Sequence, residues 1–132
     1  MIATFNDLQD KQNMFNGSTV RNEQELEAIL LSLGNRQPFF FELVGDNGFT
    51  LLVGYSPDVG CIQHSRSDGG PPYSMALSGG TLENEPFVNF LTGNTPTPIP
   101  QKYCLRADTL KMVIRGFMRD GLRSSAVDWE AL

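Results

Sequence analysis

Two apolar segments separated by a short turn constrain the fold of this chain more than any other feature. Residues 39–44 have the sequence Phe-Phe-Phe-Glu-Leu-Val, and residues 49–55 have the sequence Phe-Thr-Leu-Leu-Val-Gly-Tyr. Residues 46–48 are Asp-Asn-Gly and predict the turn of a β-hairpin, because glycine adopts positive φ at little cost. Phe40 and Leu52 fall opposite the main apolar stripe, so both strands are apolar on both sides. Such strands belong in the middle of a sheet.

Residues 22–34 have the periodicity of an amphipathic helix. Asn22 can cap its N-terminus, and Glu25, three positions later, can complete a capping box. Gly34 supplies the left-handed residue that commonly ends a helix. The apolar side chains follow the i, i+3, i+4, i+7 pattern of one buried face, and they are Leu26, Ile29, Leu30 and Leu33.

Residues 107–121 have a second helical pattern, and Gly121 can end this helix in the same way. Lys111, Arg115 and Arg119 follow one another at four-residue spacing on a different face. Such a row can bind phosphates, but it is more typical of a solvated helix face, and we therefore expect no nucleic-acid binding. The apolar stripe consists of Leu110, Val113, Ile114, Phe117 and Met118.

The remaining strands are predicted to be short. Residues 65–72 are too rich in glycine and proline for regular structure, and residues 92–100 carry three prolines, so we expect a surface loop there. The region 38–91 is otherwise rich in strands. Short strands are expected within residues 1–20, 61–64, 73–77, 87–91 and 124–130. Residues 1–132 are thus predicted to form one α+β domain, with a mainly antiparallel sheet of five to seven short strands flanked by two amphipathic helices.

The charge of the chain is negative and unevenly distributed. The net charge is −5, with four basic and eleven acidic residues up to Pro100 and six basic against four acidic residues after it. An acidic body repels nucleic-acid phosphates and anionic membranes and attracts a basic protein. Acidity also serves solubility alone, and the sequence leaves that alternative open.

The sequence predicts neither a membrane-spanning helix nor a cleaved leader. No stretch approaches the roughly 18 uninterrupted apolar residues of a membrane span. Residues 1–7 contain no basic residue and reach Asp7 before an apolar segment forms. We therefore expect a cytoplasmic location, in which Cys61 and Cys104 remain thiols.

The residue types required for catalysis do not form a recognisable pattern. His64 is the sole histidine and lies in no nucleophile motif, and we interpret it as an exposed residue at a strand end. Cys61 and His64 would point to opposite faces of a strand, and a structural zinc site requires four ligands. The glycines match neither phosphate-binding motif. We expect no enzyme activity, no catalytic residue, no cofactor and no metal.

Several segments, taken in order, resemble immunity protein family one of bacterial polymorphic toxin systems. These are E-L-x-x-I-L at residues 25–30, Leu-Leu-Val-Gly at 51–54, Pro-Ile-Pro at 98–100, and A-D-T-L-x-x-V-I-x-x-F-x-x-x-G at 107–121, followed by an ending that contains Trp129. Members of this family are small cognate inhibitors encoded beside toxins, often nucleic-acid deaminases. The resemblance implies an antiparallel sheet with flanking helices, action in the cytoplasm, and inhibition by covering the active site of a toxin.

The partner expected from this resemblance and from the charge is a toxin with a basic active-site cleft, bound by a monomer in a one-to-one complex. Acidic side chains in loops would steer the encounter, and a few anchors would slow dissociation. Each candidate is equally consistent with ordinary solvated surface, whereas Trp129 is expected to cap the core. The candidate contacts are Asp58, Asp68, Glu83 and Glu85 for charge, and His64, Arg66 and Tyr73 as anchors.

A second hypothesis is an intracellular adaptor or a small-ligand-binding domain without a toxin partner. Phe40 and Tyr55 would then line an apolar pocket. A concave apolar pocket filled by a co-purified small molecule would favour this hypothesis. A toxin gene immediately upstream, or rescue of host growth on co-expression, would favour the first.

Overall fold

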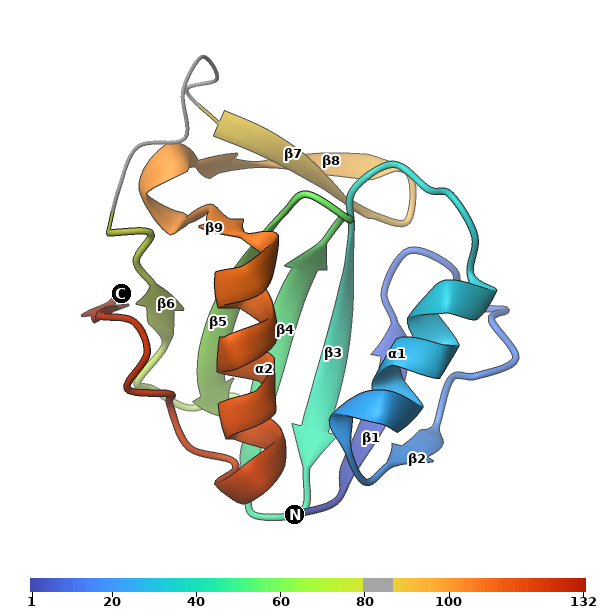
Figure 1. Ribbon diagram of the computed structural model, residues 1–132, viewed down its shortest axis with the longest axis horizontal. Coiled ribbons are helices and arrows are strands. Elements are labelled where there is room, and N and C mark those ends of the chain that lie inside the picture. The colour runs from blue at the N-terminus through green and yellow to red at the C-terminus, as the bar shows by residue number, and fades with distance from the viewer. Residues whose placement is uncertain (80–86) are drawn as a thin grey trace.

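The computed structural model describes residues 1–79 and 87–132, which form a sheet with two helices on one of its faces (Figure 1). The helices are α1 (Glu23–Ser32) and α2 (Ala107–Asp120). A short 3₁₀ helix, η1 (Gln101–Tyr103), precedes β9. The strands within the described residues are β1 (Ala3–Asp7), β2 (Ser18–Val20), β3 (Phe39–Gly45), β4 (Phe49–Tyr55), β5 (Val59–Arg66), β6 (Ser74–Ala76), β7 (Phe87–Thr92), β8 (Thr95–Pro100), β9 (Leu105–Arg106) and β10 (Trp129–Ala131).

The sheet confirms the predicted α+β class and its mainly antiparallel pairing. Its strand order is β10-β6-β5-β4-β3-β1-β2, and every neighbour on this path is antiparallel. The hairpin of β7 and β8 joins through one parallel pairing, between Phe39 and Leu91. The predicted count of five to seven strands is too low, since the described residues contain ten. The unpredicted strands are β8, which was expected to be a loop, and β9, whose two residues are too few for side-chain alternation to be recognised.

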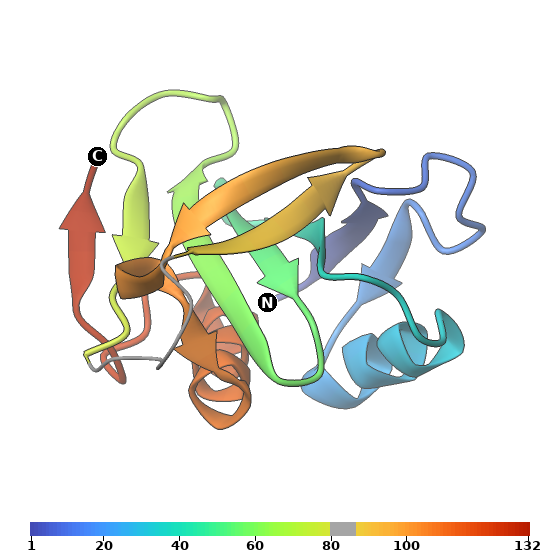
Figure 2. The same ribbon diagram turned by 90° about the horizontal axis from the view of Figure 1, so that it is seen from above.

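The hairpin of β3 and β4 lies at the centre of the sheet, as predicted. Leu43 pairs with Leu51 and Phe41 with Val53, and all four side chains are buried. They belong to the main core beneath the helices, whereas Phe40 on the other face belongs to a second core cluster. Viewed from above, the helices lie on one side of the sheet and the β7–β8 hairpin crosses the other (Figure 2). Both faces of the central hairpin are therefore covered.

Both helices begin and end close to the predicted residues. The Asn22 side chain accepts a hydrogen bond from the Glu25 N–H at 2.9 Å, which confirms the N-cap. The Glu25 carboxylate, however, accepts from the N–H of Arg21 at 2.8 Å, one residue before the position that a capping box uses. Gly121 ends α2 with φ of 74°, in the left-handed region where a side chain would be strained.

The expectation of a loop at residues 92–100 is wrong, because residues 95–100 form β8. β8 pairs with β7 alone, so it is an edge strand. Pro96, Pro98 and Pro100 occupy alternate positions, and the backbone N–H groups of a strand alternate in direction. The three missing donors therefore lie on the solvent side, where no ladder bond needs them. The same arrangement keeps another strand from pairing with this edge.

The last strand begins later than predicted. β10 contains Trp129–Ala131 and pairs with β6, whereas residues 124–128 form a turn in which the Ala126 N–H donates to the Ser124 hydroxyl at 3.1 Å. Trp129 packs against the main core and donates its indole N–H to the Ser124 carbonyl at 2.8 Å, as expected of a residue that caps the core. Within the described residues, neither helix is long and apolar enough to cross a membrane.

Gly54 in β4 provides a test of the contact between the sheet and the β7–β8 hairpin. A Cβ atom at this position would lie 2.5 Å from the Cys61 sulfur and 2.8 Å from a ring carbon of Phe90. We expect Gly54→Ala to lower the free energy of unfolding by about 1–3 kcal/mol through overpacking. The control is Gly70→Ala. A Cβ atom at Gly70 would lie 3.1 Å from Oδ1 of Asp68, and this exposed side chain can shift to make room. Urea unfolding of both variants measures the difference, and equal stability would contradict the close packing.

Candidate partner-binding site

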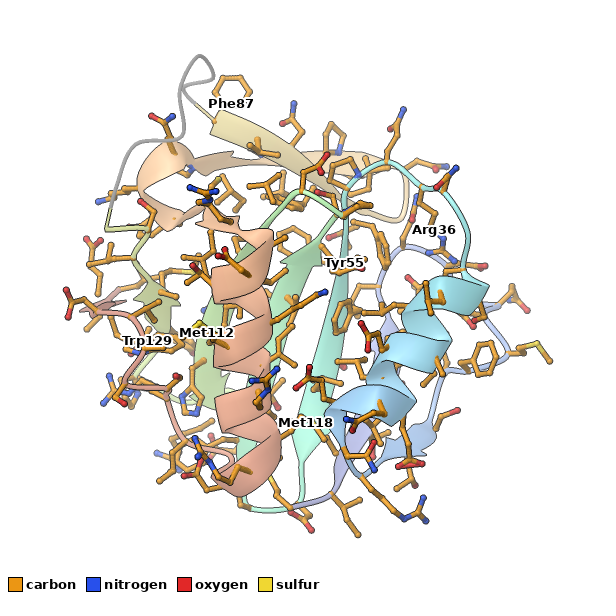
Figure 3. The ribbon with its side chains drawn as sticks, in the orientation of Figure 1. Arg36, Tyr55, Phe87, Met112, Met118 and Trp129 are labelled. Carbon is orange, nitrogen blue, oxygen red and sulfur yellow. The ribbon has the colours of Figure 1, made fainter. Side chains whose placement is uncertain are left out.

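A groove of about 380 Å³ opens between α1 and α2, above the ends of β3 and β4. Ligand pockets commonly have volumes of roughly 300–1,000 Å³, so the groove is large enough to receive side chains of a partner. Figure 3 shows Tyr55 between the two helices and Arg36 beyond the end of α1. The sides of the groove are lined by charged residues, which include Glu23, Glu27 and Lys111. The apolar residues that line it include Leu26, Leu30, Phe39, Tyr55, Leu110 and Ile114.

The groove exists because part of the apolar stripe of α1 is not covered by α2. Leu26 and Ile29 are buried, but Leu30 and Leu33 are only half-buried, although all four follow the same helical pattern. Leu31, at the edge of the groove, has 79% of its surface exposed. The sequence therefore predicts the apolar face correctly but not how much of it remains open.

Ion pairs across the groove connect the two helices. The Arg115 guanidinium binds the Glu23 carboxylate through two bonds, Nε–Oε2 of 2.6 Å and Nη2–Oε1 of 3.2 Å. One turn further along, Lys111 Nζ lies 3.9 Å from Glu27 Oε1. The hydrogen bond from Arg115 lowers the pKa of Glu23, although partial burial opposes this shift. Lys111 and Arg115 lie on a solvated helix face, as predicted, but that face meets carboxylates of α1.

One end of the groove is fixed by a buried ion pair. Arg36 donates to Asp7 Oδ2 at 2.7 Å, and the Asp7 side chain is fully buried. The other carboxylate oxygen accepts the N–H groups of Gln9 at 2.9 Å and Asp10 at 3.2 Å. Burial by itself raises the pKa of Asp7, but hydrogen bonds from Asn13, from Arg36 and from the two N–H groups outweigh it and lower that pKa. The carboxylate thus holds the segment after β1 against the segment after α1.

The structure does not bring the predicted contact residues into one site. Arg66 ends β5, and Asp68 and Tyr73 lie in the loop between β5 and β6, which extends from the face opposite the helices (Figure 2). Arg66 donates to Asp68, and the Tyr73 hydroxyl donates to the Gly69 carbonyl, so this loop is held by its own side chains. Asp58 is exposed in the turn at the other end of β5. The predicted Glu83 and Glu85 lie outside the described residues.

The expectation that His64 is exposed is wrong. His64 is buried, with 7% of its surface exposed, and its Nε2 lies 2.9 Å from the Gly121 carbonyl oxygen. Its ring stacks on Phe49 at a centroid distance of 4.9 Å. Burial lowers the pKa of His64, and the positive charge of Arg123 lowers it further. The hydrogen bond to Gly121 raises this pKa but does not outweigh the burial. The predicted strand end is also wrong, because β5 continues to Arg66 and His64 pairs with Leu51 on one side and Ser74 on the other. α2 covers this part of the strand, which takes the imidazole out of reach of a partner.

A second cavity, of about 270 Å³, lies on the other face of the sheet. Phe40 and Cys61 line it, whereas Tyr55 lines the groove between the helices, so the two predicted pocket residues belong to different cavities. Cys61 and His64 point to opposite faces of β5, as expected. Burial strongly raises the pKa of the Cys61 thiol, which keeps it protonated and unreactive.

None of the residues that line the groove is among the predicted toxin contacts. In the sequence, Leu30 belongs to the apolar stripe of its helix and Lys111 to a row of solvated cations, and neither pattern predicts a groove. One pattern in the sequence could have indicated that the two helices face each other. α1 carries Glu23 and Glu27 four residues apart, and α2 carries Lys111 and Arg115 at the same spacing. Matching rows of opposite charge indicate that two helices face each other, although the sequence does not show how far apart they lie.

The chain is thus an α+β domain with an open, charged groove between its two helices. The profile of the family described as immunity protein Imm1 matches residues 15–131. The match covers most of the chain, and the chain belongs to this family. The resemblance noted in the sequence is thereby confirmed. A search of curated proteins found no match.

The buried ion pair makes stability depend on pH. Because folding lowers the pKa of Asp7 below its ordinary value of 3.8, the charged carboxylate stabilises the native state above that value. This stabilisation is lost as the pH falls through the folded pKa. We expect Asp7→Asn to lower the free energy of unfolding by about 2 kcal/mol at neutral pH, and by progressively less in acid. Urea unfolding between about pH 7 and pH 2 measures this, with the exposed Asp46→Asn as the control. A difference that does not change with pH would contradict the assignment.

Proposed function

We propose that this chain binds a cognate bacterial toxin domain and neutralises it by covering the active site, without performing chemistry itself. The observation that carries the proposal is the family match over residues 15–131. An immunity protein must recognise one toxin, so its function depends on the shape and charge of its surface.

The charge of the chain supports a toxin that acts on nucleic acid, such as a deaminase. Such a toxin must bind phosphates, and it therefore carries positive charge around its active-site cleft. An inhibitor with a net charge of −5 is attracted to that cleft and repelled by the nucleic acid that the toxin modifies. The same charge disfavours binding to anionic membranes. We place the encounter in the cytoplasm, between one immunity protein and one toxin.

Asp58 and Asp68, two of the acidic residues predicted from the sequence to contact the toxin, are exposed and remain candidates for steering it. Asp58 and Asp68 lie at opposite ends of β5, and a strand of eight residues is roughly 25 Å long. A partner that senses both therefore faces a broad surface of the domain, as in protein interfaces of standard size. Asp58 has no side-chain partner among the described residues, which leaves its charge available.

The groove also favours a second candidate function, the binding of a small ligand. Its volume of about 380 Å³ and its apolar floor would suit a small molecule. A small molecule that co-purifies with the chain and is displaced by substitution of Tyr55 would support that function.

The test of the first proposal is co-expression with the toxin domain encoded by the adjacent gene. We expect growth of the host to be restored, and the two purified proteins to form a one-to-one complex in light scattering. A second immunity protein from an unrelated toxin system serves as the control and should give no rescue. Continued killing by the toxin, with both proteins soluble and abundant, would overturn the proposal.

Charge reversal at the two acidic positions tests the steering. We expect the double variant Asp58→Lys, Asp68→Lys to associate with the toxin about tenfold more slowly at low salt, and the difference to shrink as salt is added. The control is Asp10→Lys, Asp128→Lys, which changes the net charge equally at other exposed positions. Association rates come from stopped-flow mixing at several salt concentrations. Equal rates for the two double variants would contradict a specific role of Asp58 and Asp68.

A further inference from the structure

We propose that the groove between α1 and α2 receives an arginine side chain of the toxin. Its aliphatic stem would lie on the apolar floor, and its guanidinium would lie against Glu27 and the ring of Tyr55. This inference rests on the proposed function, because it assigns a surface and a chemistry to the contact with the toxin.

The floor of the groove supports an occupant with a long apolar stem. Leu30 and Tyr55 are half-buried, and together with the buried Phe39 they form part of the apolar lining of the groove. An arginine side chain covers such a surface with three methylene groups while its charged end stays near the rim. A purely apolar side chain would bring no positive charge to the carboxylate of Glu27.

Two carboxylates and two cations line the groove, and the pairing between Glu27 and Lys111 is the loosest that these four groups make among the described residues. Glu23 is already satisfied by two bonds from Arg115. Glu27 instead has one distant contact, of 3.9 Å to Lys111, and both side chains of this pair are more than half exposed. An exposed pair of this geometry contributes little stability, so a guanidinium that offers two parallel bonds can replace the lysine.

Tyr55 provides the aromatic surface for the guanidinium. Its hydroxyl has no hydrogen-bond partner among the described residues. Glu27 and Tyr55 both line the groove. Burial raises the pKa of Tyr55, and the negative charge of Glu27 raises it further. A cation between them is attracted by the carboxylate and by the face of the ring.

The chain itself shows that a guanidinium fits this kind of surface. At the end of the groove, Arg36 lies over the Phe39 ring at 4.8 Å while it binds the Asp7 carboxylate. We infer a second arrangement of the same type, with Tyr55 as the ring and Glu27 as the carboxylate. Arginine suits it better than lysine, because the guanidinium is planar and stacks on an aromatic ring while it donates two bonds.

The first experiment compares two variants that each remove one negative charge. Glu27→Gln keeps the size of the side chain at the groove, and Asp128→Asn makes the same change at an exposed position without a side-chain partner among the described residues. With the inactivated toxin domain as the probe in calorimetry, we expect Glu27→Gln to weaken binding about tenfold and Asp128→Asn to change it less than about twofold. Equal effects would overturn the inference and leave the proposed function intact. If the wild type does not bind the toxin, the proposed function itself fails.

A second pair of variants removes the competing lysine. Lys111→Gln releases Glu27 for the partner, whereas Lys11→Gln removes the same charge from the exposed loop after β1. We expect Lys111→Gln to tighten toxin binding by about threefold or more relative to Lys11→Gln, chiefly through slower dissociation. Weaker binding by Lys111→Gln would mean that Lys111 contacts the toxin, and would overturn the inference.

A third measurement examines the groove without the toxin. Acetyl-arginine amide is titrated into the isotope-labelled protein, and acetyl-citrulline amide, which has a similar shape but no charge, is the control. We expect saturable shifts of the Leu30, Tyr55 and Ile114 resonances with the arginine compound, at concentrations on the order of millimolar to tens of millimolar. These shifts should be absent in Glu27→Gln. Equal shifts with the two compounds, or shifts confined to other parts of the protein, would overturn the inference.

Discussion

The two-sided apolar character of the β3–β4 hairpin is the constraint from which the rest of the structure follows. Its strands carry Phe41 and Leu43 on one face and Phe40 and Leu52 on the other. Each face must be covered, because every exposed aromatic ring would forfeit its burial free energy. The helices cover one face and the β7–β8 hairpin covers the other (Figure 2). The remaining strands extend the sheet sideways and supply the loops that connect these layers.

The groove is a consequence of the way in which the helices cover their face. Both helices contribute apolar side chains to one core cluster, but Leu30 and Leu33 of α1 remain half-buried. Along the groove, charged side chains also connect the helices, through Glu23 with Arg115 and Glu27 with Lys111. Ion pairs between long, solvated side chains contribute little stability and can exchange partners. The groove therefore presents a surface that the proposed charged partner can use.

The helices, their caps and the central hairpin could be predicted because their signals are local. Asn22, Gly34 and Gly121 act within one turn of chain, and the apolar stripes repeat over several turns. The assignment of β8 as a loop failed for a physical reason. Proline excludes a segment from the interior of a sheet, but at an edge the donors that it removes are not needed. His64 was placed on the surface because it was interpreted as the last residue of a strand, and its burial depends on α2, some fifty residues later.

The sequence by itself determined the α+β class, the position and apolar face of both helices, the two-sided central hairpin and the acidic charge, since each follows from neighbouring residues or from composition. The tertiary structure alone decided that Glu27 and Lys111 face each other, that Leu30 stays half-open, and that Tyr55 and Phe40 belong to different cavities. Those outcomes depend on the distance between elements that are far apart along the chain. That distance is set by how all the side chains between the elements pack together, and no local pattern encodes it.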